Sequence, residues 1–202
     1  LFGMLGLGFL FQMINRLCLV LLASYNFLMA DENFGIVVHG GAGVLSNLSY
    51  EQQQKIEQKV SETVLSAYEI IKNGGTSLDA VEFAVSELED SPLFNAGRGA
   101  VYSFDEVQEM DASIMSGLDR SAGAVASVKI VKNPIKLARK VLEETEHVLL
   151  VSDGAESFAK TIGVQVVDPS YFHSDKNLKR LRKVKNKISH NTLVQDKIGT
   201  VG

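Results

Sequence analysis

A glycine–threonine pair near the C-terminal end could serve as both a cleavage site and a nucleophile. The last four residues are Gly199, Thr200, Val201 and Gly202. Attack of the Thr200 hydroxyl group on the carbonyl carbon of Gly199 would form an ester that water can hydrolyse. Thr200 would then carry a free α-amine, whose ordinary pKa of about 7.7–8 suits a base near neutral pH. Glycine before the threonine leaves the attack unobstructed, because it has no Cβ atom.

The second candidate is Asn95, in the segment 91–101, which reads Ser-Pro-Leu-Phe-Asn-Ala-Gly-Arg-Gly-Ala-Val. Asn95 lies among glycines, where backbone amides can face a ligand. The alternative interpretation is an ordinary turn with Asn95 in the left-handed conformation. Composition alone favours the turn.

Two other patterns carry weaker signals. The run Gly40-Gly41-Ala42-Gly43 follows an apolar segment, as in a dinucleotide site, but Ser46 stands where a third glycine or alanine belongs. Four carboxylates nearby in sequence could form an acid/base pair, although a solvated hairpin turn is favoured. They are Asp105, Glu106, Glu109 and Asp111.

The bulk properties indicate one globular domain and exclude several classes of protein. The chain has 202 residues, a net charge of −4 and 46% hydrophobic residues, which suffices for a real core. The mild acidity argues against nucleic acid as a partner. The single cysteine, Cys18, cannot form an intrachain disulfide, and the four histidines are scattered, so no metal enzyme is predicted.

The first 30 residues have the character of an apolar leader. Arg16 is their only charged residue, and residues 17–23 are apolar, which is typical of a signal peptide with a cleavage point after Ala30. An uncleaved membrane anchor is the alternative. A cleaved leader would make the protein periplasmic or secreted; otherwise it would be cytoplasmic.

The hydrophobic pattern from residue 34 predicts a layered α/β fold, with sheets flanked by helices. Two strands precede the third helix, so a doubly wound parallel sheet is not expected. Capping signals at Ser49 and Thr76 start the first two helices, and Asn133-Pro134 starts the third. The expected strands are 34–39, 109–117, 121–131 and 147–151, and a short helix should end at Gly163.

Three of the expected helices carry apolar stripes that should face the core. The first stripe is Ile56, Val60, Val64, Ala67 and Ile71; the second is Leu78, Val81, Val85 and Leu88; the third is Ile135, Ala138, Val141 and Leu142.

A basic segment follows at 174–198, and we expect it to be either a basic helix or a mobile linker. Seven lysines and arginines lie between residues 175 and 190. A surface for nucleic acid or anionic membrane is disfavoured, because no aromatic residues are interleaved with the charges.

Several segments, in this order and spacing, resemble the plant-type L-asparaginase and isoaspartyl peptidase family of amino-terminal-nucleophile hydrolases. They span roughly residues 35–202, and glycosylasparaginases are more distant relatives. The segments are 38–43 (Val-His-Gly-Gly-Ala-Gly), 92–99 (Pro-Leu-Phe-Asn-Ala-Gly-Arg-Gly), 110–115 (Met-Asp-Ala-Ser-Ile-Met), 123–126 (Gly-Ala-Val-Ala) and 199–202 (Gly-Thr-Val-Gly).

The resemblance implies an αββα sandwich that is made as one precursor and cut between Gly199 and Thr200. Residues 31–173 would then form the α-subunit half of this domain, and residues 199–202 the cleavage site and the start of the β subunit. The partners would be that β subunit, a second αβ unit in a homodimer, and a small substrate, L-asparagine or a β-aspartyl dipeptide. The fold is incomplete in this chain, so we expect it to be inactive alone. The alternative is a non-catalytic, truncated α-subunit fragment that only partners a β chain.

The resemblance also implies two roles for the segment around Asn95. Asn95 matches a family asparagine beside the nucleophile and would support the site. No cofactor is expected for catalysis, but a structural sodium ion could be held by main-chain carbonyl groups, as suits a hard cation. By position these would belong to Leu88, Glu89, Ser91, Phe94, Ala96 and Arg98.

Overall fold

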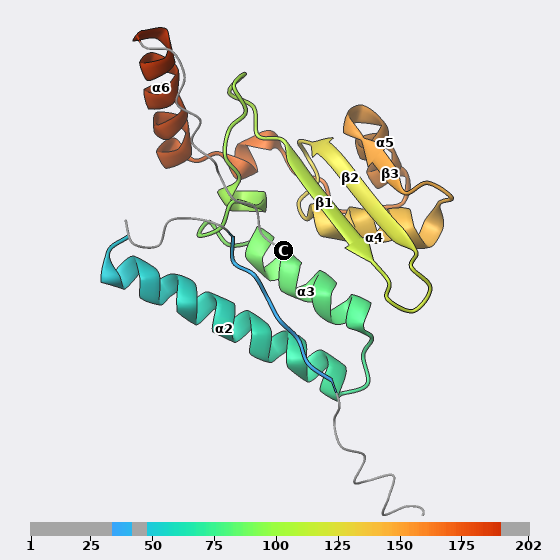
Figure 1. Ribbon diagram of the computed structural model, residues 1–202. Coiled ribbons are helices and arrows are strands. Elements are labelled where there is room, and N and C mark those ends of the chain that lie inside the picture. The colour runs from blue at the N-terminus through green and yellow to red at the C-terminus, as the bar shows by residue number, and fades with distance from the viewer. Residues whose placement is uncertain (1–33, 42–47, 191–202) are drawn as a thin grey trace, which may run out of the picture. The chain divides into compact units, whose positions relative to one another are not determined.

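This computed structural model describes residues 34–41 and 48–190, and its strands form one small mixed sheet (Figure 1). β1 (Met110–Met115) pairs antiparallel with β2 (Ala122–Val128), and β3 (Leu149–Val151) pairs parallel with β2. The strand order is β1-β2-β3, so β1 and β3 are the outer strands. These strands confirm the expected strands at 109–117, 121–131 and 147–151, with shorter bounds.

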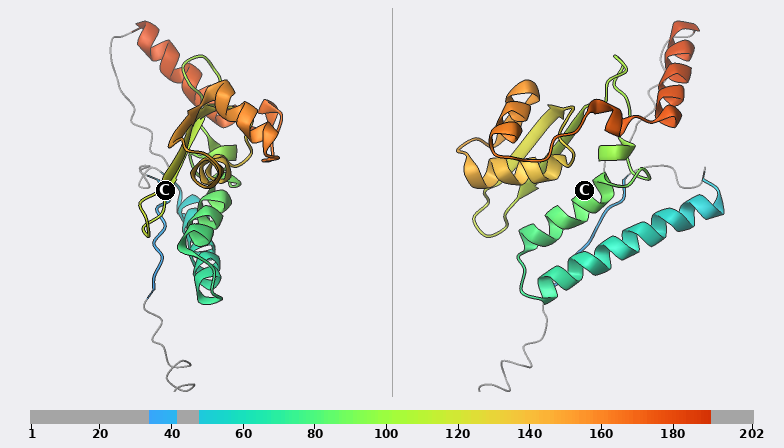
Figure 2. Two further views of the ribbon diagram at one scale, coloured as in Figure 1. Left: turned by 90° about the vertical axis from the view of Figure 1, so that its right-hand side faces the viewer. Right: turned by 180° about the vertical axis from the view of Figure 1, so that it is seen from behind.

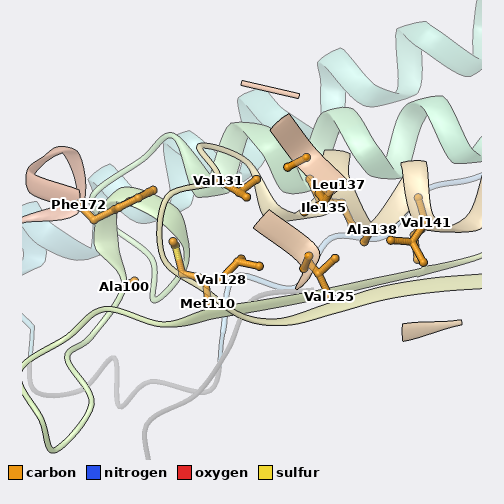
Figure 3. Close-up of a cluster of buried hydrophobic side chains, with 13 residues drawn as sticks. Ala100, Met110, Val125, Val128, Val131, Ile135, Leu137, Ala138, Val141 and Phe172 are labelled. Carbon is orange, nitrogen blue, oxygen red and sulfur yellow. The ribbon is translucent and has the colours of Figure 1, made fainter. Parts of the chain in front are cut away.

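Helices α4 (Pro134–Glu144) and α5 (Ser152–Thr161) cover one face of the sheet (Figure 2). α4 approaches β2 very closely at Gly123, where a Cβ atom would collide with the carbonyl oxygen of Ala138. Glycine in this strand therefore allows the helix to pack directly on the sheet backbone. The core between them is formed by buried residues from β1, β2 and α4, including Met110, Val125, Val128, Leu137 and Val141 (Figure 3).

Helices α2 (Tyr50–Lys72) and α3 (Ser77–Glu89) form a connected pair, and their starts confirm the predicted capping signals. The Ser49 side chain accepts from the amide of Gln52 and Thr76 accepts from that of Asp79, each as part of a capping box. Between the helices, Gly74 takes a φ of 86°, a conformation that glycine adopts without steric cost.

The predicted stripe of α3 was only partly right. Val81 is 38% exposed, whereas Ala80 and Ala84 are buried and pack toward α2. Leu78 and Val85 pack on the opposite side, against the core of the sheet. α3 is buried on two sides, so its core-facing surface is wider than a single stripe.

The predicted strand at 34–39 was wrong. Residues 34–41 are neither helix nor strand, although their burial alternates: Ile36 and Val38 pack against Ala67, Ala80 and Ala84, while Val37 is 95% exposed. The segment is thus one-sided, as a strand would be, but no strand within the described ranges pairs with it.

The chain then passes through η3 (Pro169–Phe172) into helix α6 (Asp175–His190). The described part of the basic segment is therefore helical rather than irregular. Among the residues with described positions, no helix is long and apolar enough to cross a membrane. The expected leader at 1–30 and the Gly199–Thr200 pair lie outside the described residues. The layered α/β arrangement is confirmed in its coarse form.

Candidate functional site

Asn95 is fixed by a hydrogen bond across its own loop. Its side-chain oxygen Oδ1 accepts from the main-chain amide of Val101 at 2.9 Å. Asn95 does not have a positive φ; Gly97 takes that conformation instead, with φ 46°. The interpretation of Asn95 as a left-handed turn residue is therefore wrong, and its side chain closes the loop.

The loop folds tightly around its two glycines, and the short helix η2 (Gly97–Gly99) lies at its centre. A Cβ atom at Gly97 would collide with the carbonyl oxygen of Glu89, and one at Gly99 with the carbonyl oxygen of Phe94. Both positions therefore require glycine, because only bare backbone fits against those oxygens.

The structure brings the first sequence motif against the second. A Cβ atom at Gly40 would lie 3.2 Å from the ring of Phe94 and 3.3 Å from the side chain of Val60. His39 turns back on its own segment, since its Nδ1 accepts from the amide of Gly41 at 3.3 Å. The described part of the 38–43 segment thus lies beside the residue that precedes Asn95.

A cavity of about 510 Å³ joins the Asn95 loop to the hairpin. Its walls come from the end of α3, from the loop and from both β1 and β2. Among the residues described, β1 pairs with no strand on its outer side, so one of the strands that line the cavity has an open edge. The lining residues with polar side chains are Glu89, Asn95, Glu109, Asp111 and Ser113.

Glu89 is the buried ionisable group of this cavity. Only 3% of the residue is exposed, and its Oε1 accepts from the main-chain amide of Ile135 at 3.0 Å. Its Oε2 is buried without a hydrogen-bond partner. Burial raises the pKa of Glu89 to about 8, outweighing the hydrogen bond from Ile135, which lowers it. The sequence predicted only that the main-chain carbonyl group of Glu89 would hold a sodium ion. It did not indicate that the Glu89 side chain is buried and accepts from Ile135.

The six residues expected to hold a sodium ion lie around this turn, at the end of α3 and in the loop. Two of their carbonyl oxygens already accept hydrogen bonds: Leu88 from the amide of Ser91 at 3.2 Å, and Ala96 from that of Gly99 at 2.9 Å. The Arg98 guanidinium lies 5.5 Å from the ring centre of Tyr171, so it points to another part of the chain. Across residues 34–41 and 48–190, no three His, Cys, Asp or Glu side chains cluster as metal ligands would.

The acidic residues near the hairpin do not form a paired-carboxylate site. Glu106 contacts Arg182 and Lys185 on α6, at 2.8 and 3.3 Å. Glu109 lies 3.4 Å from the Nζ of Lys129, and Asp111 accepts from the amide of Ser127 at 2.8 Å. Each of these three carboxylates has its own partner, so they do not form the acid/base pair. The favoured hairpin turn is also not at this place, because Asp111 lies within β1 and the hairpin turns between Met115 and Ala122.

Two further polar side chains hold the loop, and sequence reasoning missed both. Buried Gln108 donates to the carbonyl oxygens of Ala100 and Phe172, at 2.8 and 2.6 Å. Asn177, on α6, donates to Gly99 and Ala100 at 3.0 and 3.2 Å. Neither residue belongs to a motif, and their partners lie 8 to 78 positions away, so no local signal marks them.

Comparison with known proteins identifies the family. The asparaginase family model matches residues 32–202. An isoaspartyl peptidase/L-asparaginase from Homo sapiens is 44% identical over 168 residues, which are 83% of this chain and 54% of that protein. A plant-type L-asparaginase from Pyrococcus furiosus is 49% identical over 148 residues, 73% of this chain and 47% of that protein. A putative isoaspartyl peptidase/L-asparaginase from Dictyostelium discoideum is 44% identical over 153 residues, 75% of this chain and 44% of that protein.

The chain belongs to the asparaginase family of hydrolases, which confirms the resemblance drawn from its motifs. Membership implies the fold of the amino-terminal-nucleophile hydrolases, of which the helices and the sheet described above form a part. The chain spans about half the length of the curated relatives it matches.

Proposed function

We propose that the complete protein is an isoaspartyl peptidase with L-asparaginase activity, which hydrolyses β-aspartyl amide bonds. The observation that carries this proposal is the family match, which runs through Gly199 and Thr200 to residue 202. The names of the relatives support both activities, since the human protein carries both in its name.

The chemistry begins with cleavage of the precursor. The Thr200 hydroxyl attacks the carbonyl carbon of Gly199, the C–N bond between them breaks, and an ester with a free Thr200 amine results. Water hydrolyses the ester, which leaves a carboxylate on Gly199 and restores the hydroxyl of Thr200.

The same hydroxyl then attacks the side-chain carbonyl carbon of asparagine or of a β-aspartyl dipeptide. The free amine of Thr200 accepts the hydroxyl proton and passes it to the leaving group, which departs as ammonia or as an amino acid. A β-aspartyl ester of Thr200 remains, and water releases aspartate from it. Asn95 would lie beside the nucleophile and help to position it.

The open edge of β1 supports a partner for this half of the fold. The cavity beside Asn95 is lined in part by β1, and an unpaired strand edge readily accepts another strand. We place the strand that begins at Thr200 there. Within the described part of the chain, the sheet face away from α4 is also uncovered, with Met115, Leu149 and Val151 exposed by 60%, 51% and 52%. A β subunit that supplies the second sheet of an αββα sandwich would cover it, and without it the chain would be inactive.

The proposal includes a sodium ion at the turn between α3 and η2. The carbonyl oxygens of Glu89 and Phe94 lie against the bare backbone of Gly97 and Gly99 in this turn. Oxygen ligands suit a hard cation. Such an ion would hold the loop in shape and would take no part in bond breaking.

The remaining features of the proposal concern export and assembly. Residues 1–30 would direct the protein to the periplasm or the outside as a cleaved signal peptide. The mature αβ unit would pair with a second copy.

The decisive experiment expresses the complete gene with Thr200 intact or as Thr200→Ala. Wild-type protein should give two bands on a denaturing gel and should release aspartate from L-asparagine or a β-aspartyl dipeptide. Thr200→Ala should give one band and no turnover, whereas the nearby control Thr192→Ala should behave as wild type. Wild-type protein that stays in one piece and is active would refute cleavage, and an inactive cut protein would refute the activity.

A further inference from the structure

We propose that Asn177 is a positioning residue for the Asn95 loop, through which helix α6 holds the active-site asparagine in place. The inference rests on the proposed function, because it takes Asn95 to support the nucleophile. It assigns a task to the basic segment, whose sequence suggests only a solvated helix or linker.

The hydrogen bonds form a short path from α6 to Asn95. The side-chain amide nitrogen Nδ2 of Asn177 donates to the carbonyl oxygens of Gly99 and Ala100, at 3.0 and 3.2 Å. The Ala100 carbonyl belongs to the same peptide group as the amide nitrogen of Val101. That amide donates to Oδ1 of Asn95 at 2.9 Å. Asn177 and Asn95 therefore hold opposite sides of one peptide plane, which is rigid.

The first turn of α6 is itself held in place. The Ser174 side chain accepts from the amide of Asn177 at 3.3 Å, as an N-terminal cap does. The amide of Ser174 donates to the hydroxyl of Tyr102 at 3.3 Å, and that hydroxyl lies 2.8 Å from Nδ1 of His173. The Asn177 side chain is thus presented from a fixed helix start.

Asn177 reaches the Asn95 loop itself, at Gly99 and Ala100. α6 also contacts the segment after the loop, where Arg182 and Lys185 meet Glu106 and Lys185 lies over the ring of Phe104, but the Arg182 side chain is 59% exposed. Exposed ion pairs contribute little, because water screens the charges. The Asn177 amide instead meets carbonyl groups of the buried residues Gly99 and Ala100. Losing it would take this donor from the Gly99 oxygen and would leave Ala100 with Gln108 alone.

The link matters because α6 is the last described element before the Gly199–Thr200 pair in the sequence. Gln108 also donates to Ala100, but its other bond goes to Phe172 in η3, so it does not reach α6. Asn177 comes from the segment that leads to the cleavage site, so it ties the position of the Asn95 loop to that segment.

The variant Asn177→Asp separates positioning from helix stability. Aspartate has the same shape and is favourable in the first turn of a helix, so α6 should persist. It offers no amide donor, however, and would place a carboxylate against two carbonyl oxygens. Lys179→Ala, on an exposed position of the same helix, is the matched control.

The experiment uses protein made from the complete gene, and it measures two quantities. Hydrogen–deuterium exchange of the Val101 amide should become at least about tenfold faster in Asn177→Asp, as expected for two lost hydrogen bonds. The kcat for L-asparagine should fall about three- to tenfold with KM within about twofold, because a misplaced loop affects the reaction more than binding. Lys179→Ala should change neither.

Unchanged exchange at Val101 would overturn the inference, whatever the activity. Faster exchange with unchanged kcat would also overturn it, because Asn177 would then serve structure alone. If the wild-type protein neither cleaves itself nor turns over substrate, the proposed function fails, and the exchange result still decides whether Asn177 positions the loop.

Discussion

The carboxyl group of Glu89 accepts a hydrogen bond from the main-chain amide of Ile135 at 3.0 Å, so the last residue of α3 caps the first turn of α4. Asn133 was expected to cap this helix, but it makes no such bond. Its amide instead donates to the carboxylate of Asp90 at 3.2 Å. The start of α4 therefore depends on a side chain from another helix, and this contact joins the sheet layer to the Asn95 loop.

The first prediction concerns the pH dependence of stability. The pKa of Glu89 is raised to about 8 from 4.5, so the folded protein holds this proton more tightly than the unfolded chain. The contribution of protonated Glu89 to the free energy of unfolding is complete below about pH 4.5, and it is lost as the pH rises through about 8. Glu89→Gln keeps an acceptor for Ile135 and cannot ionise, so its Tm should fall less than that of the wild type between pH 5 and 9. Thermal denaturation measures this, with Glu57→Gln at an exposed position of α2 as control; parallel curves for wild type and Glu89→Gln would contradict it.

The second prediction concerns the contact between the sheet and α4. Gly123→Ala would place a methyl group against the carbonyl oxygen of Ala138, which is backbone and cannot move aside cheaply. We expect a loss of about 1–3 kcal/mol in the free energy of unfolding, measured by urea denaturation. Gly154→Ala, on α5, has no atom within 4 Å of the new Cβ and should not destabilise. An equal loss in both variants would argue against a specific clash.

The third prediction separates the contribution of Asn95 to stability from its proposed role in self-cleavage. Asn95→Ala removes the acceptor for the Val101 amide, so it should lower stability by about 1 kcal/mol and also impair self-cleavage. Asn95→Asp keeps an accepting oxygen in place, so its stability should stay closer to the wild type. Urea denaturation and the rate at which two bands appear on a gel give the two readouts. Equal losses of stability would show that the Val101 contact is not what the alanine variant removes.

The fourth prediction concerns the start of α3. Thr76 accepts from the Asp79 amide at 3.1 Å, and Asp79 accepts from the Thr76 amide at 2.9 Å. Thr76→Ala should therefore cost about 1 kcal/mol, whereas the adjacent Ser77→Ala, which lies outside the capping pair, should cost less. Chemical denaturation of the two variants side by side measures the difference.

The sequence predicted best those structural features that depend on contacts between residues close together in the chain. Ser49 and Thr76 start helices through bonds to residues three positions on, and such contacts can be read from spacing alone. The two strands of the hairpin were also expected, because each one lies within a single short segment of the sequence. In the loop, the motif identified Asn95 as a candidate, but only the structure showed that its oxygen accepts from Val101.

Contacts between distant parts of the chain could not be predicted. Glu89 meets Ile135 across 46 positions, and Asn177 meets Gly99 across 78. A glutamate at position 89 does not by itself indicate a helix cap, and an asparagine at position 177 does not by itself indicate a contact with the loop. The apolar run at 34–39 suggested a strand, but a strand also needs a partner, and the pattern of one segment does not reveal one.

The uncovered face of the sheet has a consequence for synthesis of the protein. In the proposed complete protein, the strands that would cover Met115, Leu149 and Val151 follow Gly202, so these side chains leave the ribosome first. At about 5–20 residues per second, this apolar surface would meet water for seconds before those strands could cover it. We expect chaperones to bind the nascent chain during that interval.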